Sequence, residues 1–240
     1  GLGNFEFLFS DKFYRASFVT TAVFSILVTL CSMIPALFLA VMADRLIKGS
    51  GTYRTMLIWP YAVAPAIAGV LWLFMFNTRV GVVSWYLGQL GYDWNHVLNG
   101  GEAMGLVVIA SAWGRISYNF LFFLAALQAV PRSVIEAAAI DGASPIRKFI
   151  YVTFPLMAPI SIGAIIIRLI EASKIMDTVY VLTSGGPGTS TETSSFYIFI
   201  KGLREFQMGY AASMSFTYLI IMIISLTVIA KVLTKLLLKD

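Results

Sequence analysis

The sequence has little of what metal sites and soluble enzymes use. Of its 240 residues only 12% are charged, one is a cysteine (Cys31) and one is a histidine (His96). A soluble domain carries about 25% charged residues, so this composition argues against one. An intrachain disulfide needs two cysteines, and a metal site needs several close ligands, so we expect neither. We expect Cys31 to be a small packing residue in an apolar run and His96 to lie in a surface loop.

The sequence also lacks the motifs of nucleotide hydrolysis and nucleophilic catalysis. A P-loop ends in Gly-Lys-Ser or Gly-Lys-Thr, because backbone amides and the lysine hold the phosphates. The nearest candidate, Gly185-Gly186-Pro187-Gly188-Thr189, has no lysine. No Ser/His/Asp arrangement suggests hydrolysis. We therefore expect a chain that is not an enzyme, with no catalytic residues and no cofactor of its own.

Long apolar runs dominate what is present. Hydrophobic residues make up 59% of the chain, and about 20 helical residues cross a hydrocarbon core. Five runs have that length, at about 16–43, 56–76, 104–130, 160–183 and 209–233. They predict an all-α fold, a polytopic membrane helical bundle with five spans in a single transmembrane domain, residues 1–240. Pro35 predicts a kink in the first span, and Pro60 and Pro65 predict an irregular second one.

The basic residues predict the orientation of these spans. The net charge of +5 could suggest nucleic acid, but the basic residues are scattered between apolar runs, so we expect a lipid bilayer and no nucleic-acid partner. The larger basic set lies in two loops and the C-terminal tail: Arg45, Lys48, Arg54, Arg132, Arg147, Lys148, Lys231, Lys235 and Lys239. The opposite side holds Lys12, Arg15, Arg79, Lys201 and Arg204. Cytoplasmic loops carry the excess of Lys and Arg, so the larger set and the C-terminus are expected in the cytoplasm.

Two further helical features are expected outside the spans. An interfacial helix is expected over Phe196–Phe206. Between the third and fourth runs, Ser133 and Glu136 have capping-box spacing, and Gly142 is a helix stop. Ser144-Pro145 suits the start of a second helix, with the serine as cap. An alanine-rich helix–turn–helix on the cytoplasmic side, shaped for docking, is the prediction, and an ordinary helical hairpin is the alternative.

This segment, about 131–159, resembles the EAA loop of sugar-type permease subunits of ATP-binding-cassette (ABC) importers. The resemblance rests on Glu136-Ala137-Ala138, Asp141-Gly142-Ala143, Val152-x-Phe154-Pro155 and Pro159. In that family the loop is the cytoplasmic coupling element, held in a cleft of the ATP-hydrolysing subunit. The resemblance implies that coupling to the ATPase falls to Glu136, Ala137, Ala138, Asp141, Gly142 and Ala143.

The resemblance extends over nearly the whole chain. Residues 1–5, Trp59-Pro60, 183–187 and 209–212 are similar to sugar-type importer permeases. More particular segments, at residues 60–66, 91–96 and 116–123, resemble the first permease subunit of sn-glycerol-3-phosphate importers. Residues 178–182 instead resemble the oligosaccharide branch, so the solute stays open.

The same resemblance implies the partners and the location. It implies the type I importer permease fold, a second permease subunit, two ATP-binding subunits that hold ATP and Mg, and an extracytoplasmic solute-binding protein. It also implies a multi-pass protein of a bacterial or archaeal inner membrane. Because the family has at least six spans, a further span is expected before Gly1.

Polar residues inside the runs are the candidates for a solute pathway. Ser111, Arg115 and Asn119 are four residues apart and share one helical face. The fourth run carries, at intervals of three, Arg168, Glu171, Lys174 and Asp177. Charges inside a span usually face a bundle interior or a water cavity. They either line the pathway or form an internal ladder of i,i+3 pairs, Arg168–Glu171, Glu171–Lys174 and Lys174–Asp177, that fixes helix packing.

Together these features predict a permease subunit that forms half of the pathway of an ATP-driven importer. The solute would be sugar-like or glycerol-phosphate-like, and anionic if the basic residues in the spans bind it. An ion-coupled secondary transporter, with Glu171 and Asp177 as coupling carboxylates, is the alternative. A membrane-embedded enzyme would need a nucleophile or a metal set, and we find neither in the sequence.

Overall fold

The protein is described by a computed structural model over residues 3–45 and 50–238. Its helices are α1 (Gly3–Ser10), α2 (Lys12–Arg45), α3 (Ser50–Ile58), α4 (Pro65–Met75), α5 (Val82–Gln89), α6 (Gly100–Ala129), α7 (Arg132–Ile140), α8 (Pro145–Lys148), α9 (Phe154–Ser173), α10 (Asp177–Leu182), α11 (Ser194–Phe199) and α12 (Met208–Leu237). A 3₁₀ turn, η1 (Trp59–Ala62), lies between α3 and α4, and π-helical turns, η2 (Phe149–Thr153) and η3 (Ile200–Arg204), follow α8 and α11. Within the two described ranges no residue lies in a β-strand, so the all-α prediction is confirmed.

The predicted spans are present with altered bounds. Within the described ranges, 4 helical segments are long and apolar enough to cross a membrane, at Lys12–Asp44, Gly100–Ala129, Pro145–Ser173 and Met208–Leu237. A fifth is formed by Thr55–Ala62 and Pro65–Met75, which are bent by 97°. The polytopic bundle is thereby confirmed, and its second span is irregular as predicted. α2, in contrast, continues as one helix through Pro35.

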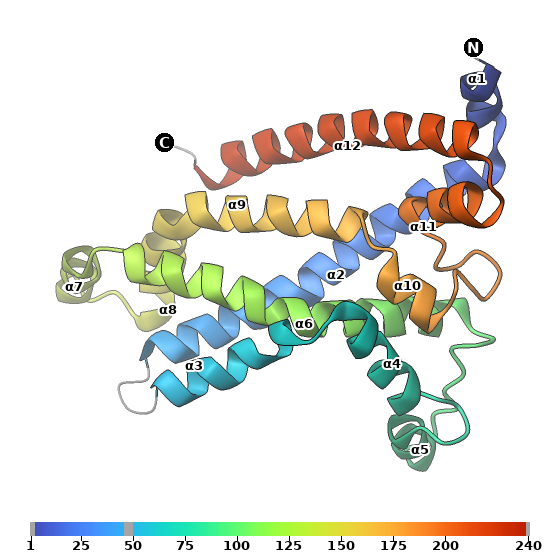
Figure 1. Cartoon of the computed structure of the whole chain (residues 1–240). Helices are drawn as coiled ribbons and strands as arrows, with labels where there is room; N and C mark the ends of the chain where they lie inside the picture. The colour runs from blue at the N-terminus through green and yellow to red at the C-terminus, as the bar shows by residue number, and fades with distance from the viewer. Residues whose placement is uncertain (1–2, 46–49, 239–240) are drawn as a thin grey trace.

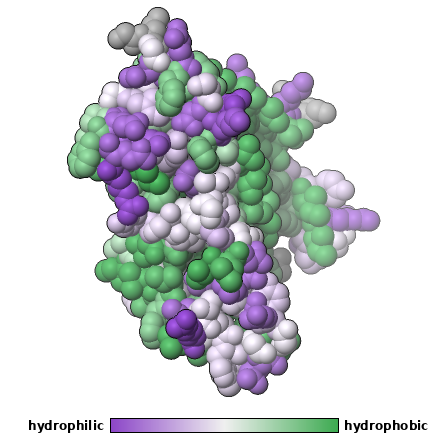
Figure 2. All heavy atoms as spheres, turned by 90° about the vertical axis from the view of Figure 1, so that its right-hand side faces the viewer, coloured by the Kyte–Doolittle hydropathy of each residue, from purple (hydrophilic) through white to green (hydrophobic). Residues whose placement is uncertain are grey.

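The long helices run alongside one another between two ends of the molecule (Figure 1). α7 and α8 lie at one end with the last turns of α2, α6 and α12, and we call it the α7 end. α1, α5, α10 and α11 lie at the opposite α11 end. Figure 2 faces that end and shows hydrophilic residues across it and apolar residues along its sides. The polar end and the apolar flanks suit helices that cross a bilayer.

Small residues let α2 lie close to α6, its most extensive neighbour. Ala36, Ala40 and Ala43 are buried on one face of α2 and pack in a cluster with Phe120 and Phe123 of α6. Small side chains at such an interface allow the backbones to approach. A second cluster, nearer the α11 end, contains Phe24, Leu106, Val179 and Phe196. By contrast, only 6% of an 18-residue apolar stretch of α12 is buried, so α12 presents a long apolar surface outward.

Asp11 ties the start of the chain to α11 and α12. Its Oδ1 accepts hydrogen bonds from the backbone N–H groups of Phe13 (2.9 Å) and Tyr14 (3.2 Å), so it caps α2. Its Oδ2 accepts hydrogen bonds from the hydroxyls of Tyr197 (2.8 Å) and Tyr210 (2.7 Å). Burial alone would raise the pKa of Asp11, but the hydrogen bonds outweigh burial and lower this pKa. The cluster joins residues nearly 200 positions apart, which no local pattern reveals.

The fourth predicted span, 160–183, is wrong at both ends. The helix α9 begins earlier, at Phe154, and is continuous with α8 and η2. It ends at Ser173, and α10 turns away to pack against α4. The helix breaks there because α10 buries Val179 and Leu182 in the second cluster, which contains Phe24, Leu106 and Phe196. The segment expected as an interfacial helix is helical and begins two residues earlier, at Ser194.

Two expectations about single residues are also wrong. Cys31 is exposed on α2 and does not pack inside the bundle, because the inward face of that turn is taken by Ser32 and Met33. His96 is buried, with 5% of its surface exposed, because the loop folds back and the Trp94 Nε1–H donates a hydrogen bond to His96 Nδ1 (3.2 Å). Burial lowers the pKa of His96.

Candidate functional site

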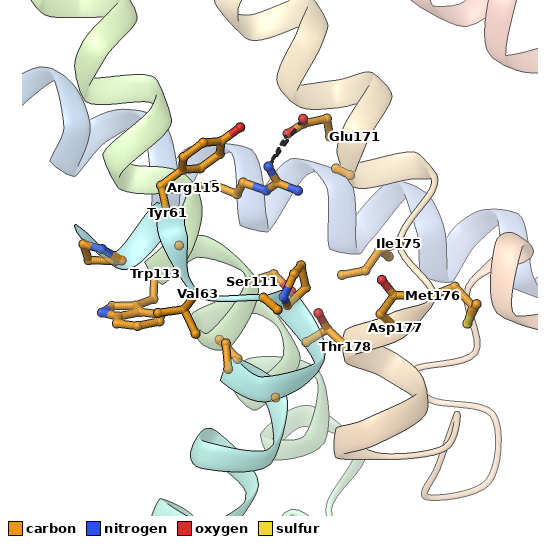
Figure 3. A pocket seen from close by; sticks show the side chains of 18 of the residues that line it. Tyr61, Val63, Ser111, Trp113, Arg115, Glu171, Ile175, Met176, Asp177 and Thr178 are labelled. Carbon is orange, nitrogen blue, oxygen red and sulfur yellow. Dashed lines mark hydrogen bonds and ion pairs between the residues drawn. The ribbon is translucent and has the colours of Figure 1, made fainter. Parts of the chain in front are cut away.

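A cavity of about 600 Å³ lies between η1, α4, α6, α9 and α10. Its polar and charged lining residues are Ser111, Arg115, Arg168, Glu171, Lys174, Asp177 and Thr178. Figure 3 shows Arg115 and Glu171 facing each other from two helices, with Ser111, Asp177 and Thr178 around the same space. Of the seven pathway candidates, all except Asn119 line this cavity.

The bend in the second span forms one wall of the cavity. Pro60 lies at the start of η1 and Pro65 at the start of α4. A residue that precedes proline is driven out of the helical region, and Ala64 is accordingly extended, with φ −58° and ψ 135°. Gly69 of α4 is buried against α10, where a Cβ would lie 3.2 Å from Val181. The prolines and this close contact hold α4 at an angle to α3, and the backbone of residues 60–65 borders the cavity.

Arg115 and Glu171 form the ion pair of the cavity. Arg115 Nη1 donates a hydrogen bond to Glu171 Oε1 (3.5 Å) and lies 3.4 Å from Oε2. The two side chains are 31% and 26% exposed. Charge-assisted bonds between such groups are usually about 2.7–2.9 Å long. The pair is therefore loose, and both side chains are partly accessible from the cavity.

Arg168 is the buried arginine of the cavity lining. Only 3% of its surface is exposed. Its Nε–H donates a hydrogen bond to Ser32 Oγ of α2 (3.1 Å), and its Nη2 has no hydrogen-bond partner among the described residues. A buried, incompletely paired guanidinium keeps its positive charge next to the cavity at an energetic cost.

The predicted ladder of i,i+3 pairs is wrong. In the described ranges the ion pairs are Arg115–Glu171 and Lys201–Glu205, so neither Lys174 nor Asp177 is paired. Glu171 reaches across to α6, and α9 ends one residue before Lys174, so the spacing of a continuous helix no longer applies. Both Lys174 and Asp177 are exposed at the cavity.

Ser111 and Asn119 differ from each other although they lie on one helix. Ser111 borders the cavity, and its Oγ has no hydrogen-bond partner within residues 3–45 and 50–238. Asn119 is fully buried, and both of its amide atoms lack a partner in the same ranges. Asn119 is therefore buried inside the bundle and does not line the cavity.

Sequence reasoning missed the aromatic side of the cavity. Tyr61 and Trp113 belong to its lining. The Tyr61 ring stacks on Tyr118, with centroids 5.5 Å apart, and Trp113 packs edge-on against Trp72, with centroids 6.2 Å apart. The proline-flanked break at Tyr61 was the available signal, because an irregular span faces protein or water.

The α7 end carries the second candidate site, a helix–turn–helix that stands apart from the bundle (Figure 1). Among the described elements α7 packs mainly on α8 and η2. Large side chains around it are exposed: Ile140 is 87%, Ile146 72% and Tyr151 75% exposed. Below it lies a smaller cavity of about 340 Å³, lined by Val41, Asp44, Leu127, Ile135, Pro145, Lys148, Phe149 and Thr153. Glu136, Ala137, Asp141 and Gly142 are exposed, while Ala138 and Ala143 are partly covered.

The turn after α7 is built as predicted, but the start of α7 is not. Gly142 has φ +76°, a conformation that favours glycine, and Ala143 N–H donates to the Ala138 carbonyl (3.1 Å) to end the helix. The Ser144 hydroxyl accepts a hydrogen bond from Arg147 N–H (3.4 Å) and caps α8. The capping box at Ser133 is wrong, because Pro131 occupies the N-cap and Ser133 lies inside the helix.

The described residues offer little for metal chemistry. Within residues 3–45 and 50–238, no group of three or more His, Cys, Asp and Glu side chains could hold a metal ion.

Comparison with known proteins identifies the family. Residues 9–240 match the model of the family described as "Binding-protein-dependent transport system inner membrane component". The chain is 48% identical over 232 residues to the sn-glycerol-3-phosphate transport system permease protein UgpA of Yersinia enterocolitica, which covers 95% of this chain and 78% of the relative. It is 47% identical to UgpA of Salmonella typhi over the same shares.

Solved structures share the fold. A bacterial ABC transporter involved in the import of the acidic polysaccharide alginate aligns with a TM-score of 0.85 and 18% identity, over 98% of this chain and 83% of the other. The same kind of transporter, in complex with an alginate pentasaccharide-bound periplasmic protein, aligns with a TM-score of 0.86 and 20% identity over 100% and 84%. The family match, the close relatives and the shared fold together show that the chain belongs to the inner-membrane permease subunits of binding-protein-dependent ABC importers.

Proposed function

We propose that this chain forms half of the translocation pathway for an anionic, glycerol-phosphate-like solute and that the α7–α8 element couples it to ATP hydrolysis by partner subunits. The observation that carries the solute class is the charge of the cavity. Three basic and two acidic side chains line it, so the lining has a net positive charge. The near relatives that transport sn-glycerol-3-phosphate support the same class.

The lining suits a small polar solute with one charged end. Guanidinium groups pair with phosphate oxygens through two parallel hydrogen bonds, and Arg115 is the more accessible of the two arginines in the cavity. Ser111 and Thr178 offer hydroxyls, and Tyr61 and Trp113 offer aromatic surfaces for the carbon skeleton. Arg168, Lys174 and Asp177 set the surrounding charge. In the assembled importer the second permease subunit would supply the other half of this lining.

Coupling is assigned to the helix–turn–helix at the α7 end, with the whole chain, 1–240, acting as a single permease domain. The exposed surface of Glu136, Ala137, Asp141 and Gly142 suits a cleft on an ATP-binding subunit, and Ala138 and Ala143 support the turn. The excess of Lys and Arg at this end favours a cytoplasmic location for it and for the C-terminus. ATP and Mg would bind to two partner subunits, and a solute-binding protein would dock at the α11 end. The bundle then needs only two conformations that the partners bias.

Two other functions receive less support. An ion-coupled transporter would use Glu171 and Asp177 as coupling carboxylates, but Glu171 is already paired with Arg115 and the family is ATP-driven. A neutral oligosaccharide remains the second candidate solute, because residues 178–182 resemble that branch and aromatic rings line the cavity.

Uptake by the complete importer tests the proposal. Proteoliposomes with the partner subunits and the binding protein are supplied with ATP and labelled sn-glycerol-3-phosphate or a labelled neutral disaccharide. We expect ATP-dependent uptake of the phosphate ester only. Uptake of the disaccharide alone would overturn the solute assignment and leave the permease assignment in place. Uptake that persists without the ATP-binding subunits and collapses with an uncoupler would overturn the ATP-driven mechanism.

A further inference from the structure

Glu171 shares the cavity lining with two arginines, Arg115 and Arg168, and forms an ion pair with Arg115. We propose that Glu171 is an internal stand-in for the anionic group of the solute: an incoming phosphate group replaces it on Arg115, and Glu171 then pairs with Arg168. This inference rests on the proposed function and adds to it how the pathway accepts an anion and what happens to the carboxylate it displaces.

The existing pair is suited to exchange. Arg115 and Glu171 meet at 3.4 and 3.5 Å, through one nitrogen of the guanidinium, and both side chains are about a quarter to a third exposed. Partly exposed ion pairs contribute little to stability, because water competes for both groups. A phosphate group can offer Arg115 two shorter, parallel hydrogen bonds. The anion therefore has a better contact to make than the glutamate that it displaces.

The second partner is already in place. Arg168 precedes Glu171 by three positions on α9, the spacing at which helical side chains can pair. Arg168 Nη2 is buried and has no hydrogen-bond partner among the described residues. Glu171 Oε2 is also buried and makes no hydrogen bond there; its one ionic contact is Arg115 Nη1, at 3.4 Å. The Nε–H of Arg168 is held by Ser32, which anchors the guanidinium while its Nη2 remains available. Arg168 Nη2 and Glu171 Oε2 would pair with each other once Glu171 leaves Arg115.

The exchange keeps the Glu171 carboxylate paired in both states, and in the occupied state it also gives the buried Arg168 a charged partner. A buried charge that loses its partner is strongly unfavourable. With two arginines and one glutamate, the empty cavity pairs Arg115 with Glu171, and the occupied cavity pairs Arg115 with phosphate and Arg168 with Glu171. A neutral sugar cannot replace the carboxylate, so the arrangement selects for anions. It also explains why a pairing of Arg168 with Glu171 fits the sequence but is absent from this conformation of the described chain.

Binding of labelled sn-glycerol-3-phosphate to the complete importer in detergent, without the binding protein, tests this exchange. We expect Glu171→Gln to tighten binding about fivefold, because it removes a partly exposed competitor. Asp177→Asn removes the same charge from the same lining without freeing Arg115, so we expect it to tighten binding less than Glu171→Gln does. Equal tightening by the two variants would show a general charge effect and overturn the proposal.

A double variant tests the second half of the exchange. We expect Arg168→Gln to weaken binding about tenfold, because the displaced glutamate then has no buried partner. In the Glu171→Gln background the same change should weaken binding less than about threefold, because no carboxylate needs a new partner. Equal losses in both backgrounds would overturn the proposal. If Arg168→Gln does not assemble, the comparison of Glu171→Gln with Asp177→Asn still decides it.

Failure of the exchange and failure of the solute assignment give different results. If the wild-type importer binds sn-glycerol-3-phosphate and the effects of Arg168→Gln and Glu171→Gln on binding are additive, the exchange is contradicted and the solute assignment stands. Wild-type importer that binds only a neutral disaccharide contradicts the solute class, and the exchange with it.

Discussion

The α7–α8 element and the cavity are built in opposite ways. The element is formed by one continuous stretch, packs mainly on its own neighbours in sequence and leaves its large apolar side chains exposed. The cavity takes its charges and aromatic rings from helices far apart in the chain and turns them inward. The difference supports the proposal that the first is a docking surface for a partner subunit, whereas the second is a solute site inside the bundle. Damage to one should therefore leave the other intact.

Gly142→Asp tests the α7–α8 element and should have the largest effect of the variants. We expect uptake to be abolished while the protein remains in the membrane, because a charged side chain enters the exposed turn at φ +76°. A Cβ there meets no atom within 4 Å, so the cost to the folded chain is the strain of a side chain at positive φ and not a clash. Uptake and membrane content are measured together.

Matched variants separate charge from backbone strain. Gly142→Asn has the same shape without the charge, and asparagine tolerates positive φ, so it should retain more uptake. Gly51→Asp places the same side chain at the same end, where a Cβ also meets no atom within 4 Å, and should leave uptake near normal. Normal uptake in Gly142→Asp contradicts the coupling assignment.

Arg115→Ala tests the cavity and should impair its proposed role as the solute site. We expect uptake of the phosphate ester to fall about ten- to hundredfold, because a charge-assisted contact with the solute is lost. Arg79→Ala removes an exposed arginine outside the cavity and serves as its control. An unchanged rate in Arg115→Ala would make the cavity arginines packing residues.

The same contrast explains what could be predicted from sequence. The turn at Gly142 and the cap at Ser144 were predictable, because each depends on residues within a few positions. The spans were predictable from their apolar runs, since the bilayer imposes length and composition. The ladder on α9 was wrong because the partner of Glu171 lies 56 residues away on α6. The break before α10 was missed because packing on α4, a tertiary contact, decides it.

Asp11→Asn changes a residue that lies in neither the α7–α8 element nor the cavity, and it should have a moderate effect on stability. We expect a loss of about 1–3 kcal/mol in the free energy of unfolding, because hydrogen bonds to a charged group are removed. Since the folded pKa of Asp11 is lowered, its contribution is present above the ordinary carboxyl range and is lost as pH falls through the lowered pKa. Thermal unfolding of the purified complex against pH measures it.

Glu6→Gln is the control, because Glu6 is an exposed carboxylate in the adjacent helix. Its unfolding should match that of the wild type. An Asp11→Asn variant with wild-type stability at neutral pH would show that the link from α1 to α11 and α12 contributes nothing.

Substitution of Cys31 should have the smallest effect on stability. Chemical labelling of this cysteine tests whether its turn of α2 lies in the bilayer. Cys31→Ala should change the free energy of unfolding by less than about 0.5 kcal/mol, because the side chain is exposed on the outside of α2. As the single cysteine of the chain, it reports its surroundings directly. We expect modification by a lipid-soluble maleimide and not by a charged one. Rapid modification by the charged reagent would place this turn of α2 in water.

The most direct test measures ATP hydrolysis and uptake in the same proteoliposomes, for wild type, Gly142→Asp and Arg115→Ala. We predict that Gly142→Asp loses both uptake and the hydrolysis stimulated by the loaded binding protein. Arg115→Ala should lose uptake of the phosphate ester while stimulated hydrolysis continues. Identical behaviour of the two variants would contradict the separation of a coupling surface at the α7 end from a solute site in the cavity.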